Sequence, residues 1–197
     1  MTLKLAPGAV VSEAELAARL GIGRTPIREA LQRLARERLV NILPRRGIVV
    51  SEINVKSQLR LLEVRRELER LVSRSAARRA TDDERKQFRR IAAKFEKSAT
   101  TNDDVAFMRT DREFNSLQAA ATHNEFAIGA MGLMHGLSRR FWYIHYTQAA
   151  DMPATAKLHG DIARAIADGD EERAGKASDR LLDAIEKFTR DTVASDV

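Results

Sequence analysis

The sequence predicts a mainly α-helical protein in which a small N-terminal part with one β-hairpin precedes an antiparallel all-α bundle of about six helices. Three observations lead to this fold class. Apolar residues recur at helical spacing over most of the 197 residues. Two short β-rich runs flank a single turn between residues 40 and 50. Beyond residue 55, turn signals divide the chain at intervals typical of connections between helices.

The excess positive charge is concentrated in the first quarter of the chain. Residues 1–50 carry nine Lys and Arg against four Glu, a net charge of +5, whereas residues 51–197 have a net charge of only +1. This asymmetry predicts that the N-terminal part binds a polyanion. The chain has no cysteine, which excludes disulfides, thiol catalysis and cysteine metal sites. Neither a membrane span nor a secretory signal is recognisable, so a cytoplasmic protein is expected.

The first two predicted helices are separated by a tight turn. Ser12 and Glu15 form a capping-box pattern, and Gly21 is typical of the residue that ends a helix. After the turn, Thr25 can cap a second helix that has Pro26 in its first position. Both helices are expected to face a common core with their apolar residues, which are Leu16, Ala17 and Leu20 on the first and Ile27, Ala30, Leu31 and Leu34 on the second.

The stretch VNILPRRGIVV predicts a hairpin whose tip carries Arg45 and Arg46. Two helices followed by such a hairpin define a winged helix-turn-helix. The N-terminus of the second helix presents free N–H groups to a phosphate, and Arg24 and Arg28 flank that end. We therefore expect these arginines to reach phosphates or guanine edges in the major groove, and the hairpin tip to enter the adjacent minor groove. A solvated helix face would explain the helix arginines alone, but neither the basic hairpin nor the charge asymmetry.

The stretch SEAELAARLGIGRTPIREALQRLARERLVNILPRRGIVV resembles the winged-helix domain of GntR-family bacterial transcription regulators. The resemblance implies a homodimer that binds a short palindromic operator in double-stranded DNA. It also implies that the start of the second helix and the wing tip make the contacts. In this sequence those positions are Arg24, Thr25, Arg28, Arg46 and Gly47.

The chain departs from the family pattern at three places. Gly23 stands where the family usually has Ser or Thr, so one hydroxyl contact to a phosphate is expected to be missing. Arg38 stands where the family usually has Gly, and a positive φ at that position costs about 1 kcal/mol. The family also has a helix before the Pro-Gly turn, whereas only residues 1–6 precede that turn here. Either the start lies upstream, or the domain predicted for residues 1–50 is weakened by a missing or truncated first helix.

A linker at residues 51–55 leads into the helical domain predicted for residues 56–197. Its first helix is expected from about Val55 to Ala80, and Thr81 with Glu84 forms a capping box for the next helix. The first helix is expected to present one apolar stripe of Leu61, Val64, Leu68, Leu71 and Val72. The last helix starts near residue 170 and is expected to face inward with Ala174, Ala177, Leu181, Ile185 and Phe188.

Polar residues interrupt the apolar stripes of three of these helices. Arg65 lies between two leucines, Asp111 lies between two phenylalanines with Asn115 one turn later, and His159 shares a face with two isoleucines. Because inward-pointing polar groups need partners, they predict a polar pocket inside the bundle. Two alternatives stay open: Arg65 and Asp111 could form a buried ion pair, and His159 could be a satisfied core residue. The other histidines show no ligand spacing, and His145 is expected in an aromatic cluster.

The motifs LRLLEVRRELERLVSRSAARRA, DREFNSLQAAATHNEF and LHGDIARAIADGDEERAGKA resemble the FCD effector domain of the FadR-like branch of the same family. Many such domains hold a divalent metal with one Asp and three His, and a small carboxylate effector sits on the metal. By this resemblance Asp111 and His159 keep two ligand positions, while Asn115 and Leu181 replace the other two histidines. Arg65 matches an arginine that can meet the effector carboxylate. Since the remaining donors make a poor transition-metal site, a metal-free pocket is favoured.

Together these features favour a bacterial transcription regulator, commonly a repressor in this family, whose helical domain senses a small anionic metabolite. Binding would change the spacing of the two DNA-reading heads of a dimer. An alternative is an effectorless DNA-binding dimer with a degenerate pocket. A metal-dependent hydrolase would need adjacent His and Asp ligands, but His159 and Asp161 are two residues apart and cannot share a helix face. No enzymatic activity is therefore expected.

Overall fold

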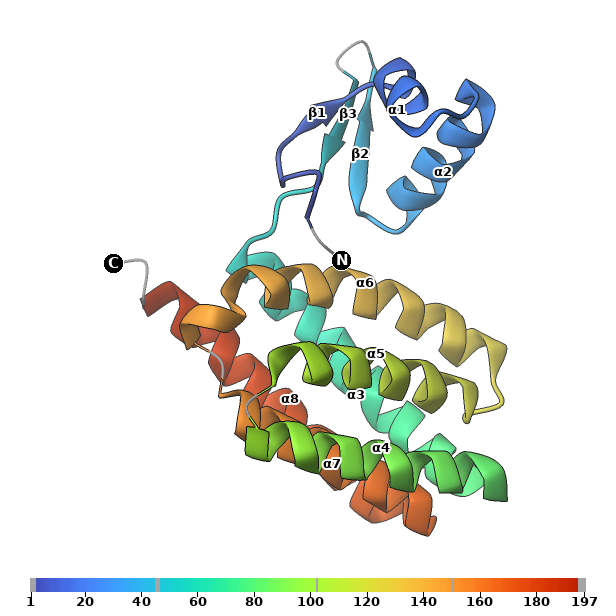
Figure 1. Ribbon diagram of the computed structural model, residues 1–197, viewed down its shortest axis with the longest axis vertical. Helices are drawn as coiled ribbons and strands as arrows, with labels where there is room; N and C mark the ends of the chain where they lie inside the picture. The colour runs from blue at the N-terminus through green and yellow to red at the C-terminus, as the bar shows by residue number, and fades with distance from the viewer. Residues whose placement is uncertain (1–2, 45–46, 102, 150, 195–197) are drawn as a thin grey trace.

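The structure is a computed structural model that describes residues 3–44, 47–101, 103–149 and 151–194. Within these residues the chain forms three short strands and eight helices (Figure 1). The strands are β1 (Val10–Val11), β2 (Val40–Leu43) and β3 (Gly47–Val50). The helices are α1 (Glu13–Leu20), α2 (Arg24–Arg36), α3 (Val55–Arg79), α4 (Asp82–Thr101), α5 (Asp104–Ala120), α6 (Glu125–Ala149), α7 (Met152–Asp168) and α8 (Glu171–Ala194). The predicted fold class, with six helices after the hairpin, is confirmed.

The N-terminal part packs α1 and α2 beside a three-stranded antiparallel sheet (Figure 1). β2 and β3 form the expected hairpin, in which Val40 lies opposite Val50 and Leu43 lies opposite Gly47. The sequence did not predict β1, which pairs with the other edge of β3 and gives the strand order β1-β3-β2. Two helices followed by this hairpin form the winged helix-turn-helix expected from the sequence.

The ends of α1 follow the sequence signals, but the start of α2 does not. The Ser12 side chain accepts a hydrogen bond of 3.1 Å from the Glu15 amide, and Gly21 ends α1 with a φ of 67°. The predicted cap of α2 by Thr25 is wrong, because the helix begins at Arg24 and Gly23 is its N-cap. Gly23 is extended and brings no side-chain hydrogen bond, so Thr25 lies inside the first turn and the N–H groups there stay open.

A small apolar core holds this part together. Its buried side chains come from both helices and all three strands, and they are Val11, Leu16, Ile27, Leu31, Val40 and Ile48. Two predicted core positions are wrong: Leu20 is 62% exposed, and Ala30 is exposed as well. Leu20 stands in the last turn of α1, beyond the edge of this core. The core is therefore smaller than the apolar pattern of α1 and α2 predicts.

The segment after α2 contains a strained residue. Arg38 has a φ of 58°, in the left-handed region that glycine adopts without steric cost. We therefore expect Arg38→Gly to raise the free energy of unfolding by about 1 kcal/mol, measured by urea denaturation followed by circular dichroism. Arg38→Ala is the matched control, because it removes the same side chain but keeps the Cβ that causes the strain. Equal stabilities of the two variants would contradict this explanation.

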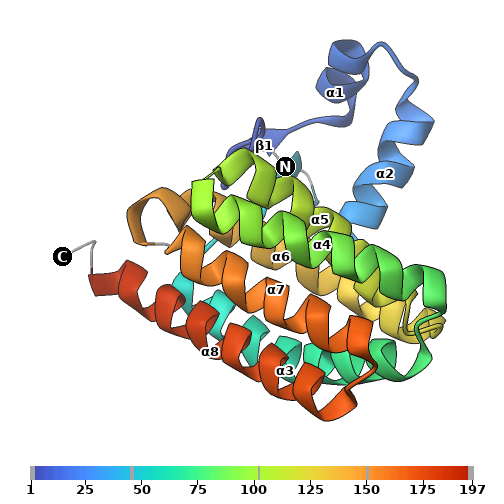
Figure 2. The same cartoon turned by 60° about the horizontal axis from the view of Figure 1, so that its bottom comes forward.

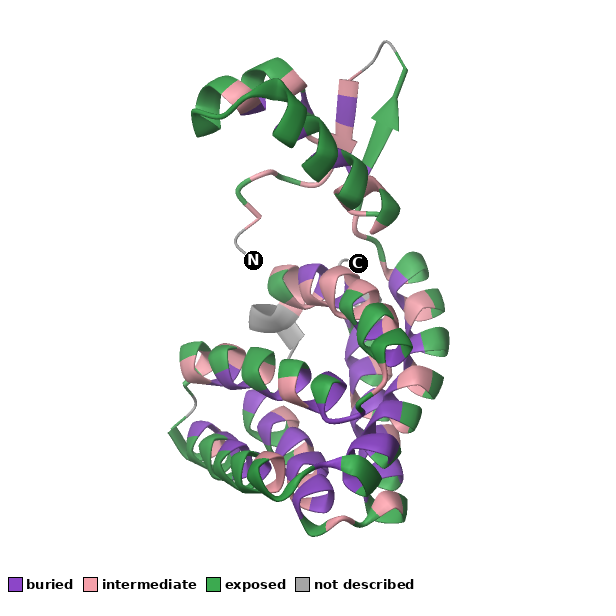
Figure 3. Ribbon diagram, turned by 90° about the vertical axis from the view of Figure 1, so that its right-hand side faces the viewer, coloured by how far each residue is buried: buried purple, intermediate pink, exposed green. Residues whose placement is uncertain are grey.

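Six helices, α3 to α8, form the larger part (Figures 1 and 2). α7 packs between α4 and α8, while α8 packs along α3; α5 and α6 complete the bundle by packing on α4 and α3 respectively. Figure 3 shows the buried residues gathered on the inner sides of these helices. Three buried phenylalanines join α4 to α5: the ring centroid of Phe114 lies 6.3 Å from that of Phe88 and 5.8 Å from that of Phe95. This aromatic core positions α5.

The predicted capping box of Thr81 with Glu84 and the predicted inward face of the last helix are confirmed. The amide of Thr81 donates to Oε2 of Glu84 over 2.7 Å, and the amide of Glu84 donates to Oγ1 of Thr81 over 3.3 Å. The five residues predicted to face inward on α8 are all buried: Ala174, Ala177, Leu181, Ile185 and Phe188. The local sequence pattern therefore predicted correctly where α4 begins and which face of α8 is buried.

The predicted apolar stripe of α3 is partly wrong. Val72 is fully buried, but Val64 and Leu71 are each 53% exposed. The side of α3 that faces the bundle carries polar side chains instead, among them Arg65 and Glu69, which are 7% and 1% exposed. Because these groups bond to one another and to α6, α3 can bury a face that its hydrophobicity alone does not predict.

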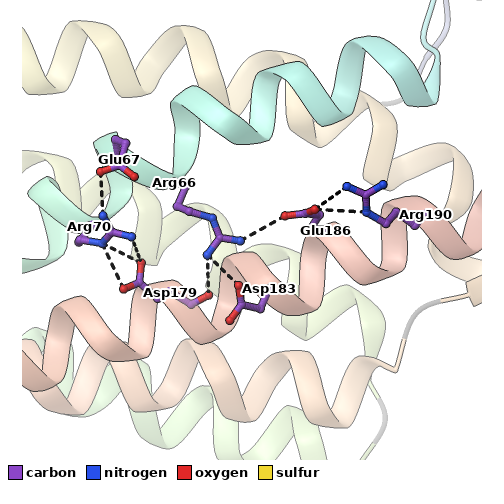
Figure 4. A network of polar contacts seen from close by, with 7 residues as sticks. All are labelled: Arg66, Glu67, Arg70, Asp179, Asp183, Glu186 and Arg190. Atoms are coloured by element: carbon purple, nitrogen blue, oxygen red, sulfur yellow. Dashed lines mark hydrogen bonds and ion pairs between the residues drawn. The ribbon is translucent and has the colours of Figure 1, made fainter.

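Ion pairs fix the outer sides of α3 and α8 against each other (Figure 4). Arg70 binds Asp179 with its Nε 2.9 Å from Oδ1, and Arg66 lies 2.7 Å from Asp183 and 3.4 Å from Glu186. Glu67 and Arg190 extend the network at its two ends. A single exposed pair contributes little to stability, but alternating charges along two helices specify their register. This contact holds α8 beside α3, where both helices contribute to the internal cavity described below.

Candidate functional site

The N-terminus of α2 forms an exposed cationic end. Arg24 and Thr25 occupy its first two positions, and both are exposed. The first N–H groups of a helix have no acceptor within the helix and lie at the positive end of its dipole. Gly23 adds no side chain that could occupy them. The N–H groups of this end can therefore donate hydrogen bonds to a phosphate oxygen, and Arg24 supplies a full positive charge beside them.

Arg28, one turn further along α2, forms an ion pair with Glu13 that was not predicted from the sequence. Its Nε lies 2.9 Å from Oε1 of Glu13, and its second terminal nitrogen lies 2.8 Å from Oε2. The hydrogen bond and charge of Arg28 outweigh a small effect of burial and lower the pKa of Glu13. The bidentate contact joins α1 to α2 and fixes one edge of an exposed guanidinium. The other edge remains available to DNA.

The wing is described only at its base, since Arg45 and Arg46 lie outside the described residues. Gly47, the first residue of β3, has a φ of 91°. A Cβ at this position would also lie 3.2 Å from the carbonyl oxygen of Val11. Conformation and space therefore both favour glycine at the start of β3.

A second candidate site is a cavity inside the helical bundle. It measures about 60 Å³, counted as space open to the centre of a water molecule. Residues from α3, α5, α6, α7 and α8 line it, and the predicted residues Arg65, Asp111, Asn115 and His159 are among them. The remaining lining residues are Gln58, Phe107, Met108, His135, Ser138, Arg139, Phe141, Trp142, Thr155, Ile185 and Phe188. Sequence spacing thus predicted four residues that the fold brings to one cavity.

Asp111 and His159 form one wall of the cavity. Nδ1 of His159 lies 2.9 Å from the carbonyl oxygen of Thr155, so that nitrogen donates. Nε2 faces Oδ1 of Asp111 at 3.4 Å, and Asn115 donates its amide to the same oxygen over 2.9 Å. Burial raises the pKa of Asp111, but the hydrogen bond and charge of His159, helped by Arg139, outweigh that effect and lower it. Asp111 is therefore a carboxylate in the folded protein.

Arg65 belongs to a different cluster from Asp111. Its Nε lies 2.6 Å from Oε1 of Glu69, and a terminal nitrogen donates to Oγ of Ser138 over 2.7 Å. The open alternative of an Arg65–Asp111 ion pair is thus wrong, because Glu69 lies one turn along the same helix and takes the guanidinium. Burial raises the pKa of Glu69, but the charges of Arg65 and His135 outweigh it and bring the pKa to about 2.

The donors at the family's metal position fit a divalent cation poorly. Asn115 turns its amide nitrogen toward Asp111 and already occupies that carboxylate oxygen. Leu181 is 1% exposed in the apolar core and is not among the cavity residues. Across the described part of the chain, no group of three His, Cys, Asp or Glu side chains is placed to hold a metal ion. The donors that remain in this cavity therefore suit a ligand bound without a metal.

Most of the wall that α6 contributes was not predicted from the sequence. The residues that line the cavity from α6 include His135, Ser138, Arg139 and Trp142, although the histidines there show no metal-ligand spacing. The signal that could have found them is their spacing of three, four and seven residues, which places all four on one side of a helix. The prediction that His145 joins an aromatic cluster agrees with its ring centroid lying 4.5 Å from that of Phe141.

Comparisons with known families identify both parts of the chain. Residues 1–50 match the family described as "Bacterial regulatory proteins, gntR family", and residues 60–184 match the family described as "FCD domain". The chain belongs to the GntR family of bacterial regulatory proteins, in the group that carries an FCD domain. It is a DNA-binding transcription regulator and not an enzyme. Within the residues described, no helix is long and apolar enough to cross a membrane.

Several individual proteins resemble the chain. It is 27% identical to the "Nta operon transcriptional regulator" of Aminobacter aminovorans over 84% of this chain and 77% of that protein. It is 24% identical to the "HTH-type transcriptional repressor RspR" of Escherichia coli K12 over 94% of this chain and 82% of that protein. A regulator from Streptomyces ambofaciens is 54% identical, but over only 27% of this chain and 23% of that protein.

Two solved structures share the fold. "E. coli McbR/YncC" superimposes with a TM-score of 0.79 and 18% identity, over 95% of this chain and 89% of that one. "Streptococcus agalactiae GntR" gives a TM-score of 0.56 and 21% identity, over 92% of this chain and 90% of that one. At these identities the likeness establishes the architecture, and the chemistry of each site must be argued from its own residues.

Proposed function

We propose that this regulator binds operator DNA as a homodimer and that a small carboxylate-bearing metabolite in the bundle cavity modulates the binding. The observation that carries the proposal is the cavity itself, where polar groups from α3, α5, α6 and α7 converge in an otherwise apolar bundle. The DNA contacts proposed are Arg24, Thr25, Arg28, Arg45, Arg46 and Gly47. One relative is named a repressor, and we propose repression here too.

A short path connects the cavity to the DNA-binding part. On α6, Ser138 and Arg139 line the cavity, and the next residue, Arg140, donates a hydrogen bond of 2.6 Å to the carbonyl oxygen of Ser51. Ser51 directly follows β3 and precedes α3. A ligand that moves this turn of α6 therefore acts on the linker that orients the winged domain. In a dimer, such a change alters the distance between the two recognition helices.

A thermal-shift screen tests the ligand proposal. The purified dimer is heated with a panel of small carboxylic acids, with Zn²⁺ or Mn²⁺, and with both together. A ligand that binds only the folded state raises the melting temperature, so at least one acid is expected to raise it without metal. Stabilisation only in the presence of metal would contradict the metal-free site. If no acid shifts the melting temperature, the effectorless DNA-binding dimer replaces the proposal.

A further inference from the structure

The cavity wall formed by α6 carries donors that the protein itself does not use. Nε2 of His135 and Nε1 of Trp142 are buried, and neither has a hydrogen-bond partner among the described residues. His135 comes closest to Glu69: Nε2 lies 3.7 Å from Oε1, within the distance of an ion pair but too far for a hydrogen bond. An indole N–H can only donate. Because buried donors without acceptors are costly, a ligand that brings acceptors to this wall gains hydrogen bonds that the protein itself does not supply.

Two more donors stand between these residues on the same side of α6. Oγ of Ser138 accepts hydrogen bonds from Arg65 and Gln58 at 2.7 and 3.1 Å, which leaves its own hydrogen free to donate. Arg139 is half-buried at the cavity. Within the described ranges no hydrogen bond or ion pair joins it to another residue. Its charge helps to keep Asp111 ionised, but its N–H donors remain free for an anion, whereas Arg65 is already paired directly with Glu69.

We infer that this α6 stripe, His135, Ser138, Arg139 and Trp142, is the anion-binding wall of the effector site and that its ligand is a small monocarboxylate. The inference rests on the proposed function and moves the carboxylate contact from Arg65 to Arg139. Four donors at helical spacing match a group that offers only acceptors. A carboxylate is such a group, and it forms charge-assisted hydrogen bonds with a guanidinium.

The rest of the cavity limits the ligand to one carboxylate and a short apolar body. Phe107 and Phe188 flank the indole of Trp142, with ring centroids 6.4 and 4.8 Å away. On the other wall, Asp111 is ionised and would repel a second carboxylate. The volume of about 60 Å³ counts only the space open to the centre of a water molecule, so the cavity has room for several water molecules and admits a chain of a few carbons.

Trp142 is the single tryptophan of the chain, so its fluorescence reports directly on the cavity. The test is a fluorescence titration of the full-length dimer with butyrate and with succinate, which have the same number of carbons. Butyrate is expected to give a saturable change and to bind at least about 10-fold more tightly than succinate. Asp111→Asn is expected to reduce the difference in affinity between butyrate and succinate, because it removes the negative charge that repels the second carboxylate of succinate. Equal binding of the two acids by the wild-type protein would overturn the monocarboxylate assignment.

Arg139→Gln tests the anchor, and Arg109→Gln is its matched control. Arg109 is exposed on α5 and does not line the cavity, so the control removes the same charge elsewhere. Arg139→Gln is expected to weaken butyrate binding about 10- to 100-fold, the effect of losing a charged hydrogen bond, while Arg109→Gln leaves it unchanged. Trp142→Phe, followed by thermal shift, is expected to weaken binding because it keeps a ring but removes the N–H.

The failure of this inference differs from the failure of the proposed function. If acids of the wider panel stabilise the dimer and Arg139→Gln does not change that stabilisation, the proposed function stands and the α6 assignment is wrong. If no acid, butyrate included, binds to the wild-type dimer, both are wrong. Melting temperatures measured without ligand show whether each variant is folded, so a lost response is assigned to the site and not to unfolding.

Discussion

Replacing Arg28 by alanine is expected to lower the affinity for operator DNA by about 10- to 100-fold. The guanidinium lies one turn into α2, exposed beside an open helix N-terminus. A bidentate contact to a guanine edge contributes about 1–3 kcal/mol of discrimination. The operator is first selected from a pool of random duplexes with the wild-type protein, and binding is then measured by fluorescence anisotropy. Discrimination between the selected and a scrambled duplex is expected to fall together with the affinity.

Arg33→Ala is the matched control for this substitution. Arg33 lies on the same helix and is paired with Glu37, and its side chain is 76% exposed. Its removal changes the net charge equally but leaves the start of α2 intact. We expect it to reduce affinity for both duplexes alike, through the general electrostatic term that also makes binding fall steeply with salt. If Arg28→Ala behaves like Arg33→Ala, Arg28 contacts no base.

Glu13 makes a sharper prediction about how Arg28 reads DNA. Because the carboxylate holds two nitrogens of the guanidinium, it fixes the direction in which the remaining donors point. Glu13→Gln removes a negative charge close to the DNA phosphates and also loosens the arginine. Affinity for the scrambled duplex should therefore rise while affinity for the selected duplex falls. A parallel change for both duplexes would mean that Glu13 acts only through its charge.

Local signals in the sequence predicted most of the winged domain, because each depends on a few adjacent residues. The capping role of Ser12, the helix end at Gly21 and the hairpin after Leu39 need only neighbours in the chain. The error at Thr25 has the same origin, since both Gly23 and Thr25 are acceptable helix starts and the neighbouring residues do not distinguish between them. β1 was missed because its two residues become a strand only when β3 lies beside them.

The helical domain was predicted less completely, because hydrophobic spacing does not reveal which polar residues are buried together. Hydrophobic spacing identified Arg65, Asp111 and His159 as interruptions of apolar stripes, but it does not indicate which residues they bind. Glu69, four residues after Arg65, was a possible helical neighbour. Its burial depends on α6, which supplies Ser138 and His135 across the bundle. The exposed Val64 and Leu71 are the reverse case, apolar residues that have no place in a face already occupied by polar contacts.

Glu69→Ala is expected to destabilise the helical domain by about 3–5 kcal/mol. The substitution leaves the guanidinium of Arg65 buried without its carboxylate, and an unpaired buried charge has a cost of that size. The double variant Arg65→Met, Glu69→Leu is expected to recover most of the lost stability, since it removes both charges and fills the space with apolar side chains. Urea denaturation of the three proteins measures the effect. A double variant less stable than Glu69→Ala would contradict a simple charge-pair explanation.

The same carboxylate predicts how stability depends on pH. Because the pKa of Glu69 falls from 4.5 to about 2 on folding, its ionised form stabilises the folded state by about 3 kcal/mol at neutral pH. That contribution is complete above about pH 5 and is lost as the pH falls toward 2. Glu69→Gln has no such group, so the difference in unfolding free energy between wild type and Glu69→Gln should shrink over this range. A difference that stays constant from pH 7 to pH 3 would mean that Glu69 is not held ionised by Arg65, so Arg65 would be free to bind the ligand carboxylate in place of Arg139.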